Sequence, residues 1–318
     1  MAKPIFSILV PVCNQEGNMT ECVNSIKAQT LKDFEVIMVD DGSTDGSYSE
    51  MHAIEEEDER FHVYRHDKNR SLLAARYTGM EHATGEYVLF LDSDDYIEPD
   101  TLESIKGEFD KTGKDIVCFG FQFEPAKRQY LPPETKDPLK SFMLGEIPPA
   151  IWKNSYRMEV IKKALERTEP FYCNMGEDVF LAGVLFSCAD SFTRLEKVLH
   201  HYIIGNGMSS QRVNLSVEKL RKAMDSVEGS AVHLTEFIQK YNPSYEESVK
   251  RAIKTMFRTV LSQYVLFTDD YTAMIRYLNE FDRGLFTETF EYGCNVLLKY
   301  KIKSDLGIEQ EKIDITVG

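Results

Sequence analysis

The chain has 318 residues, which predicts about two domains of ordinary size. Hydrophobic residues make up 42% of it and charged residues 28%, as in folded globular proteins, so the composition argues against a largely disordered chain. Acidic residues outnumber basic residues by 52 to 37, which gives a formal charge of −15. That balance disfavours nucleic-acid binding through a broad basic surface, although it permits an anionic ligand at a local site.

The sequence gives no sign of a membrane-spanning segment or a disulfide framework. Its apolar runs are much shorter than the ~20 residues that a membrane-spanning helix needs. The first residues lead directly into a predicted strand and lack a small-residue cleavage site, so we expect no signal peptide. Six scattered cysteines without a CxxC pair favour free thiols in a reducing compartment. We therefore expect a cytoplasmic protein, and leave open its association with the inner face of a membrane.

The amino-terminal part of the chain alternates apolar runs with segments of helical spacing. The apolar runs predict strands at 5–10, 34–39, 61–64 and 87–91, and the segments between them predict helices at 19–28, 47–59 and 72–82. Strands with little polar alternation that are separated by helices are typical of a parallel sheet covered on both faces.

The rest of the chain divides into a mixed section and a helical section. Between about 114 and 212 we predict strands at 115–119 and 192–204, a helix at 177–188 and a proline-rich loop over 132–149. After about residue 215 the pattern predicts helices at 216–240, 244–267, 270–281 and 285–302. We therefore predict two domains, an α/β domain over 1–212 and a helical module over 213–318.

Polar clusters follow three of the predicted strands. They are PVCNQE at 11–16, DDGSTD at 40–45 and DSDD at 92–95. Ligands bind outside the carboxyl ends of the strands in an open parallel sheet, and carboxylates gathered there repel one another unless a cation intervenes. Asp92 and Asp94 form a DxD motif that could share a hard divalent cation. The alternative is that these acids only form turns and helix caps.

Further motifs accompany these clusters in a fixed order. The full set is SILVPVCNQE at 7–16, VDDGSTD at 39–45, NRS at 69–71 with ARYTG at 75–79, GEYVLFLDSDD at 85–95 and GEDVF at 176–180. Together they resemble the family 2 glycosyltransferases of bacterial type, over roughly residues 4–210. The resemblance implies the GT-A fold, an α/β Rossmann-like fold with a mostly parallel central sheet between helices. The helical carboxyl-terminal third matches nothing that we can assign.

The resemblance also implies ligands and site residues. It implies a nucleotide-sugar donor, most often a UDP-sugar, and a divalent metal ion, Mn²⁺ or Mg²⁺. The implied donor-binding residues are Pro11, Cys13, Asn14, Glu16, Asp40, Asp41, Arg76, Asp92 and Ser93. Asp94 is the implied main metal ligand, with Asp92 and His201 as further candidates. Asp178 is the implied catalytic base, and Trp152 and Glu177 are expected to contact the acceptor.

The chemistry of sugar transfer is consistent with these roles. The leaving diphosphate must be neutralised, which a metal ion and Arg76 would do. The acceptor hydroxyl must lose its proton, and Asp178 could serve as the general base. One carboxylate that acts directly on the hydroxyl implies inversion at the anomeric carbon. The alternative for Glu177 and Asp178 is stabilisation of the first helical turn. The family usually has Tyr where Cys13 stands, and the loss of that stacking ring leaves the base preference open.

We predict an inverting, metal-dependent glycosyltransferase of cell-surface polysaccharide synthesis. Its acceptor is a glycan, a lipid-linked saccharide or a glycoprotein. A nucleotidyltransferase is the alternative enzyme, but residues 15–18 lack the glycine-rich loop with Lys or Arg that it would need. A non-catalytic nucleotide-sugar-binding module is a third interpretation, and the presence of both Asp94 and Asp178 argues against it. The helical module is expected to bind the acceptor or a second copy, so a homo-oligomer stays open.

Overall fold

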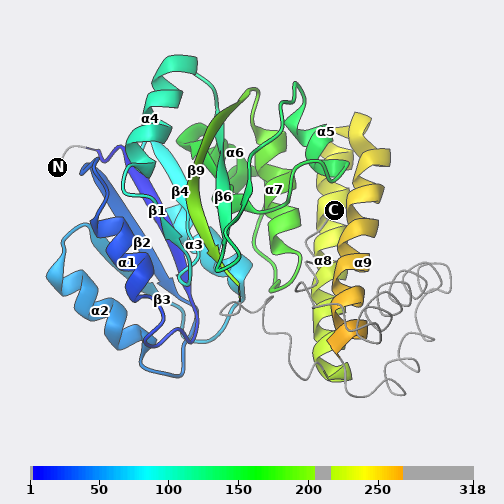
Figure 1. Cartoon of the computed structure of the whole chain (residues 1–318). Helices are drawn as coiled ribbons and strands as arrows, with labels where there is room; N and C mark the ends of the chain where they lie inside the picture. The colour runs from blue at the N-terminus through cyan, green and yellow to red at the C-terminus, as the bar shows by residue number, and fades with distance from the viewer. Residues whose placement is uncertain (1–2, 205–215, 268–318) are drawn as a thin grey trace, which may run out of the picture.

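The computed structural model describes residues 3–204 and 216–267, in which helices cover both faces of a β-sheet (Figure 1). The strands of this sheet lie in the order β3-β2-β1-β4-β8-β6-β9-β5, and β7 pairs with β6 outside this order. The α/β architecture that the sequence predicts is confirmed.

The first half of the sheet is parallel, as predicted. Its strands are β1 (Phe6–Val12), β2 (Phe34–Asp40), β3 (Phe61–Arg65) and β4 (Tyr87–Phe90), and its helices are α1 (Thr20–Lys27), α2 (Ser47–Glu57), α3 (Leu72–His82) and α4 (Thr101–Thr112). Leu9 packs in the core on the side of α3, whereas Ile8 packs on the side of α1 and α4. Every residue of β1, β2 and β4 is buried, because successive side chains point to opposite faces and both faces are covered.

The second half of the sheet is mixed. Its strands are β5 (Tyr96–Ile97), β6 (Ile116–Glu124), β7 (Arg128–Tyr130), β8 (Asn154–Arg157) and β9 (Phe192–Ile203). β8 runs antiparallel to both β4 and β6, and β9 runs parallel to β6. The sequence does not predict β5, β7 or β8. These strands have 2, 3 and 4 residues, too few to show a period, and β8 is polar although its neighbours bury it.

The remaining helices lie beside the second half of the sheet and beyond it. They are α5 (Pro138–Met143), the 3-10 turn η1 (Ile151–Lys153), α6 (Met158–Arg167), α7 (Glu177–Cys188), α8 (Val217–Tyr241), the 3-10 turn η2 (Pro243–Tyr245) and α9 (Glu246–Phe267). The prediction of a loop over 132–149 is wrong at α5. The Asp137 side chain caps that helix by accepting a hydrogen bond from the backbone N–H of Lys140 at 2.9 Å.

The two long helices α8 and α9 confirm the first two helices predicted after residue 215. They pack on each other, α8 packs on α7, and α9 packs on α5 (Figure 1). Leu234, Ile238 and Val249 are buried in the same core cluster as the residues of α7. The helices predicted at 270–281 and 285–302 lie outside the described residues.

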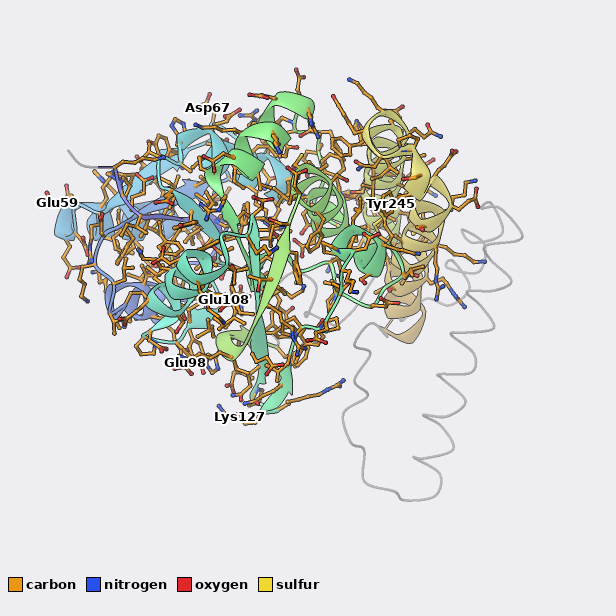
Figure 2. All side chains as sticks on the ribbon, turned by 90° about the horizontal axis from the view of Figure 1, so that it is seen from above. Glu59, Asp67, Glu98, Glu108, Lys127 and Tyr245 are labelled. Carbon is orange, nitrogen blue, oxygen red and sulfur yellow. The ribbon has the colours of Figure 1, made fainter. Side chains whose placement is uncertain are left out.

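The surface of the described chain carries exposed acids such as Glu59 and Asp67, which lie at the periphery of the molecule (Figure 2). No helix within 3–204 and 216–267 is long and apolar enough to cross a membrane.

The turn between α3 and β4 has no room for a side chain at Gly85. A Cβ atom there would lie 2.6 Å from the backbone nitrogen of Ser7 and 2.7 Å from the carbonyl carbon of Phe6. We expect Gly85→Ala to lower the free energy of unfolding by about 2 kcal/mol, because backbone atoms of β1 would have to move. Urea denaturation measures the change.

The matched control is Gly107→Ala in α4. Gly107 is exposed, and a Cβ atom added there would have no other atom within 4 Å. Alanine stabilises an exposed helical position relative to glycine by about 0.5–1 kcal/mol, so this variant should unfold at a higher urea concentration. Equal effects of the two substitutions would contradict the close packing at Gly85.

Candidate active site

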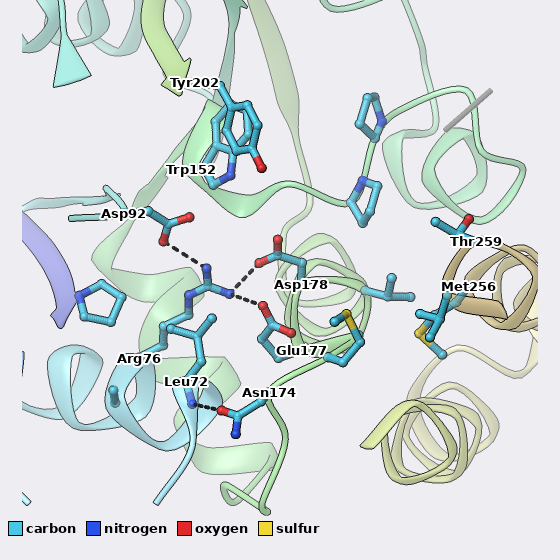
Figure 3. Close-up of a pocket in the computed structure, with 18 of the residues that line it drawn as sticks. Leu72, Arg76, Asp92, Trp152, Asn174, Glu177, Asp178, Tyr202, Met256 and Thr259 are labelled. Atoms are coloured by element: carbon cyan, nitrogen blue, oxygen red, sulfur yellow. Dashed lines mark hydrogen bonds and ion pairs between the residues drawn. The ribbon is translucent and has the colours of Figure 1, made fainter. Parts of the chain in front are cut away.

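A pocket of about 360 Å³ lies between the carboxyl-terminal edge of the parallel strands, α7 and α9 (Figure 3). The residues of the sheet edge that line it are Pro11, Val12, Cys13, Gln15, Asp41, Asp92, Ser93 and Asp94. The opposite side is largely apolar and includes Pro148 before η1, Val179 of α7 and Met256 of α9. The strand ends that the sequence singles out therefore face a shared cavity, at the place where open α/β sheets bind ligands.

The guanidinium of Arg76 lies at the centre of this pocket (Figure 3). Arg76 belongs to α3 and is only 2% exposed. Its Nη2 donates to Asp92 Oδ1 at 3.1 Å, and its Nη1 donates to Glu177 Oε1 at 3.3 Å and to Asp178 Oδ1. One cation therefore connects α3, the loop after β4 and the first turn of α7.

The acids of this pocket outnumber its one buried cation, so burial and mutual repulsion oppose the ionisation of all of them. Burial and the neighbouring Asp178 raise the pKa of Glu177 to about 8, against the opposing effect of Arg76. Burial also raises the pKa of Asp178, although Arg76 lowers it in part. Burial, then Asp95 and Asp92, raise the pKa of Asp94 to about 7. The pocket would therefore gain from a second cation.

Asp41 lies at the end of the pocket next to Cys13 and is held by backbone donors. Its carboxylate accepts hydrogen bonds from the N–H groups of Arg70 at 2.8 Å and Ser71 at 2.9 Å. The thiol of Cys13 contacts the Asp41 carbonyl oxygen at 3.7 Å and accepts from Asn69 Nδ2 at 3.4 Å. These contacts fix the loops after β1 and β2 against the start of α3.

Three of the expected donor-binding residues do not line the pocket. Asn14 and Glu16 accept hydrogen bonds, each at 2.9 Å, from backbone N–H groups in the loop after β2. Asp40 is fully buried and forms an ion pair with Arg65 at 3.0 Å. Asn14 and Glu16 therefore join the loop after β1 to the loop after β2, and Asp40 joins the end of β2 to β3.

The two further candidates, Trp152 in η1 and His201 in β9, differ in position. Trp152 lines the pocket and stacks on Tyr202, with ring centroids 5.5 Å apart. His201 lies outside the pocket lining and stacks on Tyr96. Its Nδ1 is 3.1 Å from Glu124 Oε1, and its Nε2 is 2.8 Å from Glu98 Oε1.

Several pocket residues are not predicted from the sequence. Asn174 Oδ1 accepts the N–H of Leu72 at 2.7 Å and thereby joins the segment before α7 to the start of α3 (Figure 3). Tyr202 and Met256 enter through tertiary packing of β9 and α9. One feature of the sequence points to Asn174 as a pocket residue: it stands two residues before the GEDVF motif at 176–180. Nothing in the helical spacing of α9 marks which of its residues face a pocket.

The described residues fit a divalent metal only in part. Within 3–204 and 216–267, no group of three or more His, Cys, Asp or Glu side chains is arranged to hold a metal ion. Asp94 lines the pocket and offers hard carboxylate oxygens, the ligands that Mg²⁺ and Mn²⁺ prefer. Burial first, and then the charges of Asp95 and Asp92, raise the pKa of Asp94, and a cation beside it would favour its ionised form. Asp94 therefore fits an ion whose remaining ligands come from a bound phosphate and from water.

The fold and the site define an α/β protein with an acidic ligand pocket at the end of its parallel strands. A family model described as "Glycosyl transferase family 2" matches residues 7–174, which is just over half of the chain. The chain belongs to this family.

Individual relatives agree with the family assignment. The uncharacterized glycosyltransferase EpsJ of Bacillus subtilis is 33% identical over 173 residues, which are 51% of this chain and 50% of that protein. The putative glycosyltransferase EpsH of the same species is 31% identical over 224 residues, which are 64% of this chain and 62% of that protein. The chain thus matches between half and two thirds of the length of these relatives.

Solved structures share the fold. TarS 1–349 of S. aureus in complex with UDP-GlcNAc has a TM-score of 0.61 at 19% identity, over 86% of this chain and 78% of that chain. The mannosyltransferase PcManGT of Pyrobaculum calidifontis, in complex with GDP-Man and Mn²⁺, has a TM-score of 0.52 at 17% identity, over 98% of this chain and 89% of that chain. The predicted GT-A type of fold is confirmed.

The raised pKa values predict how stability depends on pH in the absence of metal. Asp94 and Glu177 have pKa values of about 7 and about 8 in the folded chain, above their ordinary values of 3.8 and 4.5. The folded state therefore binds more protons than the unfolded state. The resulting stabilisation is complete below a pH of about 4 and is lost as the pH rises through about 7 to 8.

We expect Asp94→Asn to be more stable than the wild type at a pH of about 8 and equally stable at about 3, below the ordinary pKa of the acid, because asparagine resembles the protonated acid. Melting temperatures measured in the presence of a chelator provide the test. Asp190→Asn is the control, since the Asp190 side chain is 89% exposed and should leave the pH dependence unchanged. A difference between Asp94→Asn and the wild type that does not vary with pH contradicts the assignment.

Proposed function

We propose that the protein is an inverting, metal-dependent glycosyltransferase that moves a sugar from a nucleotide sugar, in the first place a UDP-sugar, to an acceptor hydroxyl. One observation carries the proposal. Asp41, Asp92, Asp94 and Asp178 line a single pocket, and the guanidinium of Arg76 bridges Asp92 and Asp178. The nucleotide-sugar complexes of the two structural neighbours support it.

The donor lies along the sheet edge in this proposal. Its base contacts Pro11, Cys13 and Asp41, which form one end of the pocket. Its diphosphate lies near Arg76, whose charge offsets the negative charge that grows on the leaving group. Asp94, with Asp92 and Ser93 beside it, holds the divalent ion, which adds positive charge at the same diphosphate when it is bound.

Asp178 is the proposed general base, and accessibility distinguishes it from Glu177. Its side chain is 28% exposed, whereas that of Glu177 is 10% exposed and more fully enclosed. Burial and the neighbouring Asp178 raise the pKa of Glu177, which favours its protonated form and makes it less suited to accept a proton. Direct attack of an acceptor hydroxyl that has lost its proton to Asp178 inverts the anomeric carbon.

The acceptor enters from the side of Trp152, α7 and α9. Glu177, at the start of α7, stays a proposed acceptor contact. The acceptor classes are those of the sequence prediction: a glycan, a lipid-linked saccharide or a glycoprotein. We propose that 1–212 is the catalytic domain and that the helical module over 213–318 contributes to acceptor binding, because Ala252, Met256 and Thr259 of α9 line the pocket.

Five described cysteines are free thiols, which supports the proposal that the protein works in a reducing compartment.

Two substitutions separate catalysis from donor binding. Asp178→Asn should lower sugar transfer by about 10²-fold or more, because the base is lost, and should leave binding of UDP with Mn²⁺ within about twofold. Asp94→Ala should weaken that Mn²⁺-dependent binding and lower transfer as well. Calorimetric titration of UDP and a nucleotide-release assay over a panel of UDP-, GDP- and TDP-sugars give the two readouts.

Asp100→Asn serves as the control, since Asp100 pairs with Lys197 outside the pocket. It should retain both binding and transfer. Full transfer activity in Asp178→Asn would falsify the assignment of the base. Mn²⁺-dependent UDP binding that is unchanged in Asp94→Ala would remove Asp94 as the metal ligand.

A further inference from the structure

We propose that His66, held by Thr78, is a positioning residue that fixes the orientation of the Asp41 carboxylate toward the nucleobase of the donor. This role rests on the proposed function, because it requires a nucleotide in the pocket. It adds His66 and Thr78, which lie outside the pocket lining, to the residues that act on the donor. It also gives a physical reason why the site would prefer one nucleobase.

His66 lies directly behind Asp41, at the end of β3. The ring is buried, with 6% of the residue exposed. Its Nδ1 is 2.7 Å from Asp41 Oδ1, and its Nε2 is 2.9 Å from Thr78 Oγ1. The backbone N–H of His66 also donates to the carbonyl oxygen of Asp40 at 2.9 Å, which continues the pairing of β2 with β3. Backbone and ring are therefore both fixed relative to Asp41.

The two ring contacts select one tautomer. An ionised carboxylate can only accept a hydrogen bond, so His66 Nδ1 carries a proton and donates it to Asp41. In the neutral ring Nε2 is then an acceptor, and the hydroxyl of Thr78 donates to it. Thr78 thus satisfies Nε2 in the tautomer that the contact with Asp41 selects.

The donors around Asp41 leave it one position for a ligand. A carboxylate offers about four lone-pair positions. Oδ1 accepts from His66 and from the N–H of Arg70, and Oδ2 accepts from the N–H of Ser71. Three positions are thereby occupied. The fourth belongs to Oδ2, on a side chain that lines the pocket.

A single acceptor position distinguishes between pyrimidine bases. Uracil presents its N3–H group, which can donate to Asp41 Oδ2. Cytosine presents an unprotonated N3 at the same place, and its lone pair faces that of the carboxylate. A site built to accept a hydrogen bond discriminates strongly against a ligand that lacks the donor. The discrimination requires a carboxylate that cannot turn, which is the role of His66.

The same helix carries the groups for both ends of the donor. Thr78 and Arg76 are two residues apart on α3, and the N–H groups of Arg70 and Ser71 stand directly before this helix. A displacement of α3 would therefore disturb the contacts to the base and to the diphosphate together.

Two variants of His66, each of which can keep one of the two ring contacts, test the proposal. An asparagine side chain places its amide nitrogen near the position of Nδ1 and can still donate to Asp41. A glutamine side chain reaches the position of Nε2 and can only keep the contact with Thr78. We expect His66→Gln to weaken UDP binding by about tenfold or more and His66→Asn by less than about threefold. CDP binding should change little in either variant. Calorimetric titrations use the full chain with Mn²⁺.

Thr78→Val adds an independent test, because it leaves the ring in place and removes only the donor to Nε2. It should lower the ratio of UDP to CDP affinity by an amount smaller than His66→Gln does. Equal losses in His66→Gln and His66→Asn, or losses shared equally by UDP and CDP, overturn the positioning role while the proposed function stands. A wild-type chain that binds neither nucleotide overturns the proposed function and this role with it.

Discussion

The arrangement of the site depends on one buried cation. Asp92 comes from the sheet edge, and Glu177 and Asp178 come from the start of α7, more than eighty residues later in the sequence. A buried ion pair is maintained only when its partners satisfy one another, so Arg76 sets the distance between the sheet and α7. Three acids share one guanidinium, Asp94 lies nearby, and burial raises the pKa of both Asp94 and Glu177.

The sequence predicts the first half of the fold better than the second. Three of the four parallel strands, β1, β2 and β4, are mostly apolar and buried because both faces are covered, and such runs are visible without a structure. The strand β8 is different: Asn154 and Ser155 are fully buried between β4 and β6, and only the completed sheet explains why polar residues lie there. The helix α5 depends on a cap at Asp137 that is hidden within a proline-rich stretch.

The sequence predicts which residue types gather at the site, but not which of them face the pocket. Asp40 and Asp41 are adjacent in one motif, yet only Asp41 lines the pocket, because Asp40 is the last residue of β2 and pairs there with Arg65 of β3. The apolar wall from α9 could not be predicted at all. Its residues have ordinary helical spacing, and their place in the pocket follows from how α9 packs on α5 and α8.

This apolar wall also has a consequence for biosynthesis. A chain leaves the ribosome from its amino terminus at about 5–20 residues per second, and amino-terminal parts fold first. The strands, Arg76 and α7 all precede residue 204, whereas Met256 and Thr259 belong to the last helix that the structure describes. The residues of the acidic edge therefore leave the ribosome before the residues that close the far side of the pocket. An enclosed pocket arises only when α9 has emerged and docked, so the order of synthesis makes α9 the last described element that the site needs.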